Sequence, residues 1–314
     1  MSKTNPLQTF TDSSDPFIID GGLATELEKR GHDLSDELWS ARLLMDAPEV
    51  IRQVHYDYLE AGADGLITAS YQGTIPGFMR KGFTEKEAEQ LLILSVTLAL
   101  EARERFWSNP DRRLNRKWPI VAASVGPYGA HLADGSEFTG TYDLDEDGLM
   151  EFHRRRWEIL AASQADVLAC ETIPSFAEGR VFIELFRQTS GRYGWMSFSC
   201  KDGEHISDGT PISKIAEIVD PVENVTAIGV NCTAPQYIDS LIHELKRSTN
   251  KPIVVYPNSG EIYDAELRRW TGESNTGQFA EACLAWRSAG ATMIGGCCRT
   301  GPEHIRLIRQ RLAS

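Results

Sequence analysis

Two adjacent cysteines follow two glycines near the end of the chain, at Gly295-Gly296-Cys297-Cys298, and a third cysteine, Cys232, lies upstream. Neighbouring side chains of an extended strand point to opposite faces, so both sulfurs can reach one point only where the backbone bends. Glycine permits such a bend. Three converging thiolates suit a borderline-soft metal such as zinc, and three protein ligands leave a fourth tetrahedral position open, as in catalytic zinc sites. The spacing is not that of a zinc finger, so the fold must bring the sulfurs together.

The elements that could do this alternate regularly along the chain. Eight short apolar runs read as strands, at 17–20, 65–70, 120–124, 167–171, 195–200, 227–231, 253–257 and 292–296. Amphipathic segments between them read as helices, including 48–61, 85–106, 145–162, 176–188, 212–219, 236–246 and 279–289. Such alternation predicts parallel strands with right-handed crossovers, and eight units in a chain of this length predict a single (β/α)8 TIM barrel. An open doubly wound sheet is the alternative, but the first strand–helix turn lacks the glycine-rich phosphate fingerprint.

Active sites of such barrels lie at the carboxyl ends of the strands. Cys232 directly follows the sixth predicted strand, and Cys297 and Cys298 end the eighth, so the fold predicts one zinc site at that face. Polar residues also end other strands: Asp20, Thr68, Ser70, Glu171 and Asn231. The long glycine-rich loop at 126–142 follows the third strand and is either a solvated loop or a lid over the site.

The remaining cysteines and the histidines are weaker candidates. Cys283 falls in a helix pattern and is expected in the core, Cys170 should point toward the helices, and Cys200 is a spare thiol that could compete as a ligand. A disulfide between Cys297 and Cys298 would be strained. The histidines lack the spacing of a ligand pair. His55 and His153 are expected to be hydrogen-bonded or exposed within helices, and His205 to be solvated. A capping box of Thr300 and Glu303 predicts the start of the last helix.

Composition limits the class of protein. The 314 residues carry a formal net charge of −13 with a pI near 5.1, which argues against nucleic acid or an anionic membrane as partner. We find neither a secretory signal at the N-terminus nor an apolar run of about 18 residues. Six cysteines then fit free thiols or metal ligands in a reducing compartment. We expect one domain over residues 1–314, cytoplasmic and monomeric, with small-molecule partners.

The chain resembles the homocysteine S-methyltransferases, specifically the small cobalamin-independent type that uses S-methylmethionine. The matching segments lie at 20–28, 68–72, 124–130, 169–172, 207–211, 229–232, 256–261 and 295–299. The resemblance implies a zinc-bearing barrel in which Cys232, Cys297 and Cys298 are the ligands. It further implies that Asp20, Gly21 and Glu171 hold the amino-acid end of homocysteine, with Asn231 in a substrate-site position beside the first ligand.

The implied chemistry agrees with these residue types. A free thiol has a pKa of about 8.5, and coordination to zinc deprotonates it. The thiol of a bound homocysteine therefore becomes a nucleophile. The resemblance implies transfer of a methyl group from S-methylmethionine, or secondly S-adenosylmethionine, to form methionine. A cationic sulfonium donor would suit an aromatic wall. The candidates for this aromatic wall are Trp39, Tyr71, Phe78 and Tyr128. Each of them could instead pack in the core.

Other functions remain open at this point. Related enzymes use betaine as donor or selenocysteine as acceptor, although the C-terminal arm expected of the betaine type is absent. A zinc-storage or thiol-sensing barrel would need only the sulfurs, whereas Asp20 and Glu171 at the strand ends indicate substrate recognition. Zinc hydrolases prefer His or carboxylate ligands and a general base, which disfavours them here.

Overall fold

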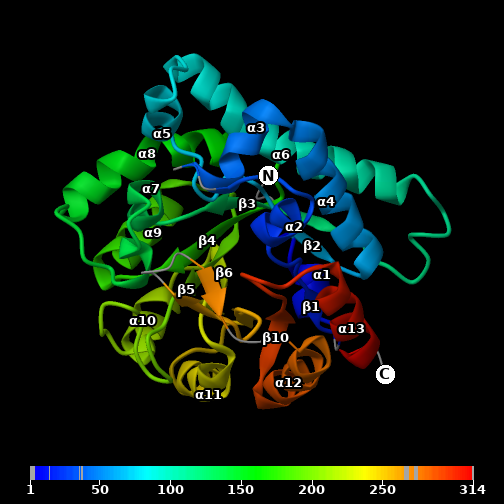
Figure 1. The fold of residues 1–314 in the computed structure, drawn as a ribbon. Coiled ribbons are helices and arrows are strands. Elements are labelled where there is room, and N and C mark those ends of the chain that lie inside the picture. Colours follow the sequence, from blue (N-terminus) through cyan, green and yellow to red (C-terminus); the bar gives the residue numbers. More distant parts are fainter. Residues whose placement is uncertain are drawn as a thin grey trace.

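The computed structural model describes residues 4–13, 15–34, 36, 38–264, 269–271 and 275–312. Its centre is an eight-stranded parallel barrel ringed by helices (Figure 1). The strands are β1 Phe17–Ile18, β2 Gly65–Ile67, β3 Ile120–Val125, β4 Val167–Ile173, β5 Gly194–Phe198, β6 Val225–Asn231, β7 Ile253–Tyr256 and β10 Ala291–Ile294. All eight predicted strands are present, so the TIM-barrel prediction is confirmed.

The strand order β1-β10-β7-β6-β5-β4-β3-β2 leaves β1 and β2 at the two ends of the hydrogen-bonded series. A parallel bridge between Ile19 and Gly65 joins these ends. There the backbone N–H of Asp20 donates to the carbonyl of Gly65 at 3.0 Å. The barrel is therefore closed just before Asp20, which places that carboxylate on the rim.

Eight longer helices form the outer layer. They are α4 Pro48–Ala61, α6 Glu85–Trp107, α8 Glu146–Ala162, α9 Phe176–Gln188, α10 Ile212–Val219, α11 Ile238–Ser248, α12 Thr276–Ala289 and α13 Pro302–Leu312. The predicted helix bounds agree with these to within three residues. None of the helices in the described part of the chain combines the length and apolar character that a bilayer crossing requires.

Shorter elements lie in the connections. They are α1 Gln8–Thr11, α2 Leu23–Lys29, η1 Trp39–Arg42, α3 Leu43–Asp46, α5 Ile75–Arg80, α7 Tyr128–Leu132, η2 Ser136–Phe138 and η3 Pro235–Tyr237. An antiparallel pair, β8 Ile262–Asp264 and β9 Arg269–Thr271, follows β7. The sequence patterns did not predict these short elements, because they lack the length over which periodicity can be recognised.

Local chemistry accounts for the starts of the long helices. Thr84 and Glu87 form a capping box at α6, and the side chains of Asp145 and Ser175 accept backbone N–H bonds at the starts of α8 and α9. The predicted capping box at the last helix is wrong in its use of Thr300. That hydroxyl donates to the carbonyl of Cys297 at 2.7 Å and accepts from the N–H of Gly22 at 3.2 Å.

Two apolar layers result from the alternation of the strands. Residues such as Ile120, Ala169, Trp195 and Met293 fill the barrel interior, while a larger cluster lies between barrel and helices. Cys170 and Cys283 belong to the outer cluster, as expected. Phe78 is also fully buried there, so it forms part of the core and not of a substrate wall.

The expectation for His55 is wrong. Its ring is fully buried in α4, and neither nitrogen has a hydrogen-bond partner among the residues that the structure describes. Burial lowers the pKa of His55 to about 4, so the ring is neutral at physiological pH. His153 is hydrogen-bonded, as expected, and His205 pairs with Asp202 on a partly exposed loop.

Candidate active site and metal centre

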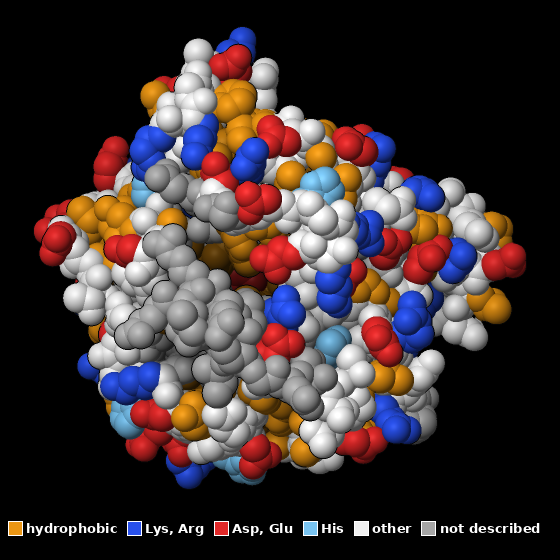
Figure 2. Space-filling view, in the orientation of Figure 1, with side chains coloured by type: hydrophobic (Ala, Val, Ile, Leu, Met, Phe, Trp, Pro, Cys, Tyr) orange, Lys and Arg blue, Asp and Glu red, His pale blue; other side chains and the backbone are white. Residues whose placement is uncertain are grey.

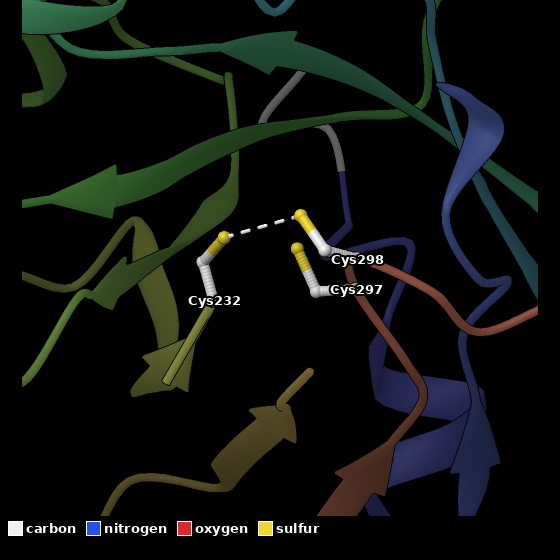
Figure 3. A group of neighbouring side chains, drawn as sticks. All are labelled: Cys232, Cys297 and Cys298. Atoms are coloured by element: carbon white, nitrogen blue, oxygen red, sulfur yellow. Dashed lines mark hydrogen bonds between the residues drawn. The ribbon is translucent and has the colours of Figure 1, made fainter. Parts of the chain in front are cut away.

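The three predicted cysteine ligands meet at the carboxyl end of the barrel. Their sulfurs all lie within 4.8 Å of one another, and those of Cys232 and Cys298 are 3.6 Å apart. Figure 3 shows the sulfurs turned toward one another, with Cys232 coming from beyond β6 and the other two from beyond β10. A tetrahedral ion with metal–sulfur bonds of about 2.3 Å places its sulfurs about 3.8 Å apart, so these residues fit a zinc ion. They are the one His, Cys, Asp or Glu group with this geometry among the described residues.

The backbone bends both at Cys232 and beside the Cys297–Cys298 pair. Cys232 and Arg299 adopt positive φ values of 50° and 66°, which non-glycine residues rarely take. A Cβ at Gly296 would lie 2.3 Å from the Thr300 hydroxyl, so glycine is required where the chain turns from β10 into the vicinal pair. This is the bend that the two glycines predicted.

Hydrogen bonds of the backbone N–H groups hold the segments that carry Cys232 and the Cys297–Cys298 pair. The N–H of Cys297 donates to the carbonyl of Pro257 at 2.8 Å, and the N–H of Cys298 donates to the side chain of Asn258 at 3.2 Å. The N–H of Cys232 reaches the carbonyl of Tyr256 at 3.3 Å. The last residue of β7 and the two residues after it therefore position all three cysteines.

The thiols strongly influence one another. The pKa of Cys298 lies well below its ordinary value because its sulfur accepts hydrogen bonds from Cys232 and Cys297. The pKa of Cys232 is raised, chiefly by its hydrogen bonds to Cys297 and Cys298 and by burial. Ionisation of all three neighbouring thiols is unfavourable because the thiolates repel one another. A divalent cation bound between them would stabilise the ionised form.

Two carboxylates lie beside the cysteines in the same rim. Asp20 and Glu171 are 3% and 6% exposed. The Asp20 carboxylate accepts the N–H of Ile67 at 2.9 Å, and burial raises its pKa well above the usual range, aided by the charges of Glu171 and Cys297. Burial likewise raises the pKa of Glu171 to about 8, although the Ser124 hydroxyl donates to it. Two desolvated carboxylates that repel each other favour a cation between them.

Gly21 lies where the chain passes closest to the last strand–helix connection. A Cβ there would lie 2.9 Å from the carbonyl and hydroxyl oxygens of Thr300 and 3.0 Å from the Tyr58 hydroxyl. That Tyr58 hydroxyl contacts the carbonyls of Gly22 and Thr300 at 3.1 Å each. Glycine at this position therefore lets the Asp20 segment pack against the segment that carries Cys297.

Asn231 is fully buried and engaged within the protein. Its Oδ1 accepts the backbone N–H of Thr172 at 2.7 Å, and its Nδ2 donates to the Thr172 hydroxyl at 2.8 Å. Thr172 has a positive φ of 58° and directly follows Glu171. Asn231 thus connects the ligand-bearing strand β6 to the carboxylate-bearing strand β4.

Comparison with known proteins adds the decisive observation. A family model described as homocysteine S-methyltransferase matches residues 17–312. The chain is 52% identical over 304 residues to homocysteine S-methyltransferase YbgG of Bacillus subtilis, covering 97% of this chain and 96% of that one. The chain belongs to the homocysteine S-methyltransferase family.

Solved structures and a second relative agree with this assignment. The oxidized form of the homocysteine methyltransferase MmuM from Escherichia coli superposes with a TM-score of 0.89 at 42% identity, covering 98% of this chain and 100% of that one. Its metallated form gives 0.87 at the same identity and coverage. The selenocysteine Se-methyltransferase of Brassica oleracea var. italica is 48% identical, covering 95% of this chain and 89% of that one. The chain is a methyltransferase, and its three converging cysteines fit a metal site.

The loop at 126–142 of this homocysteine S-methyltransferase family member lies across the carboxyl ends of β4 and β5. The Ser199 hydroxyl donates to the carbonyl of Glu137 at 3.2 Å, and a Cβ at Gly140 would lie 2.8 Å from the carbonyl of Pro174. The loop is therefore packed against the strand ends, and its role as a lid stays a prediction.

Sequence reasoning missed the network that holds this loop. The buried Glu178 carboxylate accepts the N–H of Tyr128 at 2.6 Å, the hydroxyl of Tyr142 at 3.0 Å and the Nε2–H of His153 at 2.7 Å. Arg156 donates to Nδ1 of His153 at 2.9 Å and to the carbonyl of Gly126 at 2.5 Å. Burial lowers the pKa of His153, so the ring is neutral and can both donate and accept. His153 and Arg156 lie three residues apart on α8, but the partner of His153 on α9 could not be found from local spacing.

Two of the candidate aromatic residues lie in contact. Trp39 and Tyr71 are partly buried and meet edge to face, with ring centroids 6.2 Å apart. Tyr128 instead packs against Tyr142 and Phe152 at 5.4 and 4.8 Å. Cys200, the spare thiol, lies outside the sulfur cluster and contacts the carbonyl of Phe198 at 3.9 Å.

Proposed function

We propose that this chain transfers a methyl group from S-methylmethionine to the thiol of homocysteine, forming methionine, at a zinc ion held by Cys232, Cys297 and Cys298. The observation that carries the proposal is the position of two buried carboxylates, Asp20 and Glu171, beside three sulfurs that leave one tetrahedral position open. Storage or sensing of zinc would not require those carboxylates.

Zinc, when bound, supplies deprotonation of the incoming thiol at neutral pH. The protein's own groups position the substrate. Asp20 and Glu171 receive the ammonium of homocysteine, whose charge relieves their mutual repulsion, and Gly21 leaves room for the amino-acid end. Asn231 contributes indirectly because it fixes Thr172 next to Glu171.

The reaction balances without a further reactant. A lone pair of the homocysteine sulfur forms the new S–CH3 bond. The S–CH3 bond of the sulfonium breaks, and its electron pair returns to the donor sulfur, which becomes a neutral thioether. The leaving group needs no proton, so the remaining task of the site is alignment of the two sulfurs and the methyl carbon.

Parallel assays test the proposal. Zinc-loaded protein with homocysteine is offered S-methylmethionine, S-adenosylmethionine and betaine at equal concentration, and methionine formation is followed. We expect the highest kcat/KM with S-methylmethionine, followed by S-adenosylmethionine. Preferential use of betaine would overturn the donor assignment.

A second acceptor follows from the similarity to the selenocysteine Se-methyltransferase. Selenocysteine offered in place of homocysteine tests it, and methylation at a comparable kcat/KM would extend the acceptor class. We further propose that residues 1–314 act as one barrel domain that works as a cytoplasmic monomer on small molecules. Size-exclusion chromatography with light scattering tests the monomer, because a dimer would double the mass.

A further inference from the structure

The loop at 126–142 carries two carboxylates that the proposed reaction has not used, those of the exposed Asp134 and the partly buried Glu137. Glu137 lies in η2, and its backbone is fixed from both sides. The Ser199 hydroxyl donates to its carbonyl, and Gly129 packs so closely that a Cβ there would lie 2.3 Å from the Glu137 nitrogen. The backbone is therefore held in one place.

The carboxylate of Glu137 is incompletely satisfied. Its Oε2 is buried and has no hydrogen-bond partner among the described residues. Burial raises the pKa of Glu137 to about 7, against the opposing effect of the backbone N–H groups of Glu137 and Gly135. A buried carboxylate oxygen without a partner destabilises the protein, and such groups are retained at sites where a ligand supplies the partner.

The carboxylate of Glu137 lies within electrostatic range of two tyrosines. Its charge contributes to raising the pKa of Tyr71 and of Tyr142. Tyr71 is one of the two aromatic residues in contact beside the site. Figure 2 shows a hollow on this face in which hydrophobic and acidic side chains are visible.

Glu137 lies in η2 of the loop after β3, apart from the two rim carboxylates in sequence. Asp20 follows β1 and Glu171 lies in β4, and the charge of Glu171 helps to raise the pKa of Asp20. The causes that shift the pKa of Glu137 include neither of them. The site therefore presents negative charge from two separate places. Homocysteine carries one cationic group, and the sulfonium donor carries additional positive charge that requires its own counter-charge.

We propose that the carboxylate of Glu137 binds the positive charge of the methyl donor from the lid side of the site. This inference rests on the proposed function and specifies its second substrate subsite. The donor's cation supplies the missing partner of Oε2, and the neighbouring Tyr71 and Trp39 rings add attraction to a cation through their faces. On this proposal, a cation between Glu137 and the rim links the loop to the barrel.

Direct binding tests the inference without turnover. Zinc-loaded protein is titrated with S-methylmethionine in the absence of homocysteine, by calorimetry, for wild type, Glu137→Gln and Glu137→Asp. The matched control is Asp143→Asn, which removes one negative charge from an exposed position of the adjoining segment. We expect Glu137→Gln to raise the Kd at least tenfold and Glu137→Asp less, while Asp143→Asn stays within twofold of wild type.

A second titration with homocysteine alone separates this role from a structural one. We expect its Kd to be unchanged in Glu137→Gln, and the Tm of the ligand-free variant to equal or exceed that of wild type. An unchanged Kd for S-methylmethionine, or an equal loss for both substrates, overturns the inference.

The same experiments distinguish this inference from the proposed function. Wild-type protein that binds S-methylmethionine through Glu137 but transfers no methyl group refutes the function and keeps the subsite. Protein that transfers the methyl group with an unaltered donor KM in Glu137→Gln keeps the function and refutes the subsite. Failure of wild type to bind S-methylmethionine refutes both. Competition by trimethylsulfonium shows which cationic group of the donor Glu137 binds. If Glu137→Gln no longer binds trimethylsulfonium, Glu137 binds the sulfonium group of the donor. If the variant still binds it, Glu137 binds the donor's ammonium group.

Discussion

The side-chain amide of Asn231 forms two hydrogen bonds with Thr172, 59 residues earlier in the chain, at 2.7 and 2.8 Å. Asn231 precedes the metal-site residue Cys232, and Thr172 follows the rim carboxylate Glu171. Cys232 and Thr172 both adopt positive φ values, of 50° and 58°. One buried amide therefore joins two strained positions, and the proposed metal site and the proposed homocysteine subsite share a support.

This relationship predicts a loss of stability in Asn231→Ala. The variant leaves the buried N–H of Thr172 without a partner, which costs about 1–3 kcal/mol in the free energy of unfolding. Thr172→Val removes the other half of the contact. Because both changes break the same interaction, the double variant should cost less than the sum of the two in denaturant titrations. Strict additivity would show that the contact contributes nothing.

Glu171→Gln should weaken the binding of homocysteine. Loss of a hydrogen bond to a charged group costs roughly 1.5–3 kcal/mol, or about 10- to 150-fold in KM. Metal content should stay unchanged, because Glu171 is not a ligand. Steady-state kinetics with varied homocysteine measure this, and Glu217→Gln on the exposed face of α10 is the control. An unaltered KM would count against the assignment.

Glu137 should make the stability of the ligand-free protein depend on pH. Burial raises its pKa from 4.5 to about 7. Between these values the unfolded chain has lost the proton that the folded chain retains, so the free energy of unfolding falls as pH rises, and the penalty is complete above about pH 7.

Glu137→Gln lacks this penalty, and its advantage over wild type should grow between pH 5 and 8 by as much as about 3 kcal/mol. Denaturant titrations across that range measure the difference. The charge of Asp134 adds to the shift, so its repulsion of the Glu137 carboxylate is part of the difference measured. A constant difference across the range would contradict the burial of an unpaired carboxylate at this position.

Much of this architecture could be predicted from the sequence. Strands and helices of a barrel leave periodic patterns that are local, and parallel strands place their carboxyl ends at one face, which brought Cys232 together with Cys297 and Cys298. Asp20 and Glu171 could be placed on the rim by the same reasoning. Their burial followed only from the structure, because it depends on what packs around them.

The missed features are contacts between distant parts of the chain. Glu178 on α9 is hydrogen-bonded to His153 on α8. The Thr300 hydroxyl accepts the backbone N–H of Gly22 instead of capping α13. His55 lies on the apolar face of α4 without a partner, although polar residues there are normally hydrogen-bonded. Local sequence spacing does not indicate these hydrogen-bond partners, because tertiary packing determines them.

Replacement of a cysteine ligand should abolish the metal site. Cys232→Ser, Cys297→Ser and Cys298→Ser each remove a thiolate from a three-sulfur set, so zinc content and activity should fall together in all three. Cys283→Ser, in the outer core, is the matched control and should retain both. Full zinc and activity in any of the three ligand variants would remove that residue from the set.

The central claim is that three protein thiolates hold a zinc ion whose fourth position takes homocysteine. X-ray absorption at the zinc edge tests it most directly, with and without homocysteine. The account predicts three sulfurs at about 2.3 Å in the resting protein and four when homocysteine is added. A zinc shell that holds fewer than three sulfurs at rest, or that does not change with homocysteine, would contradict it.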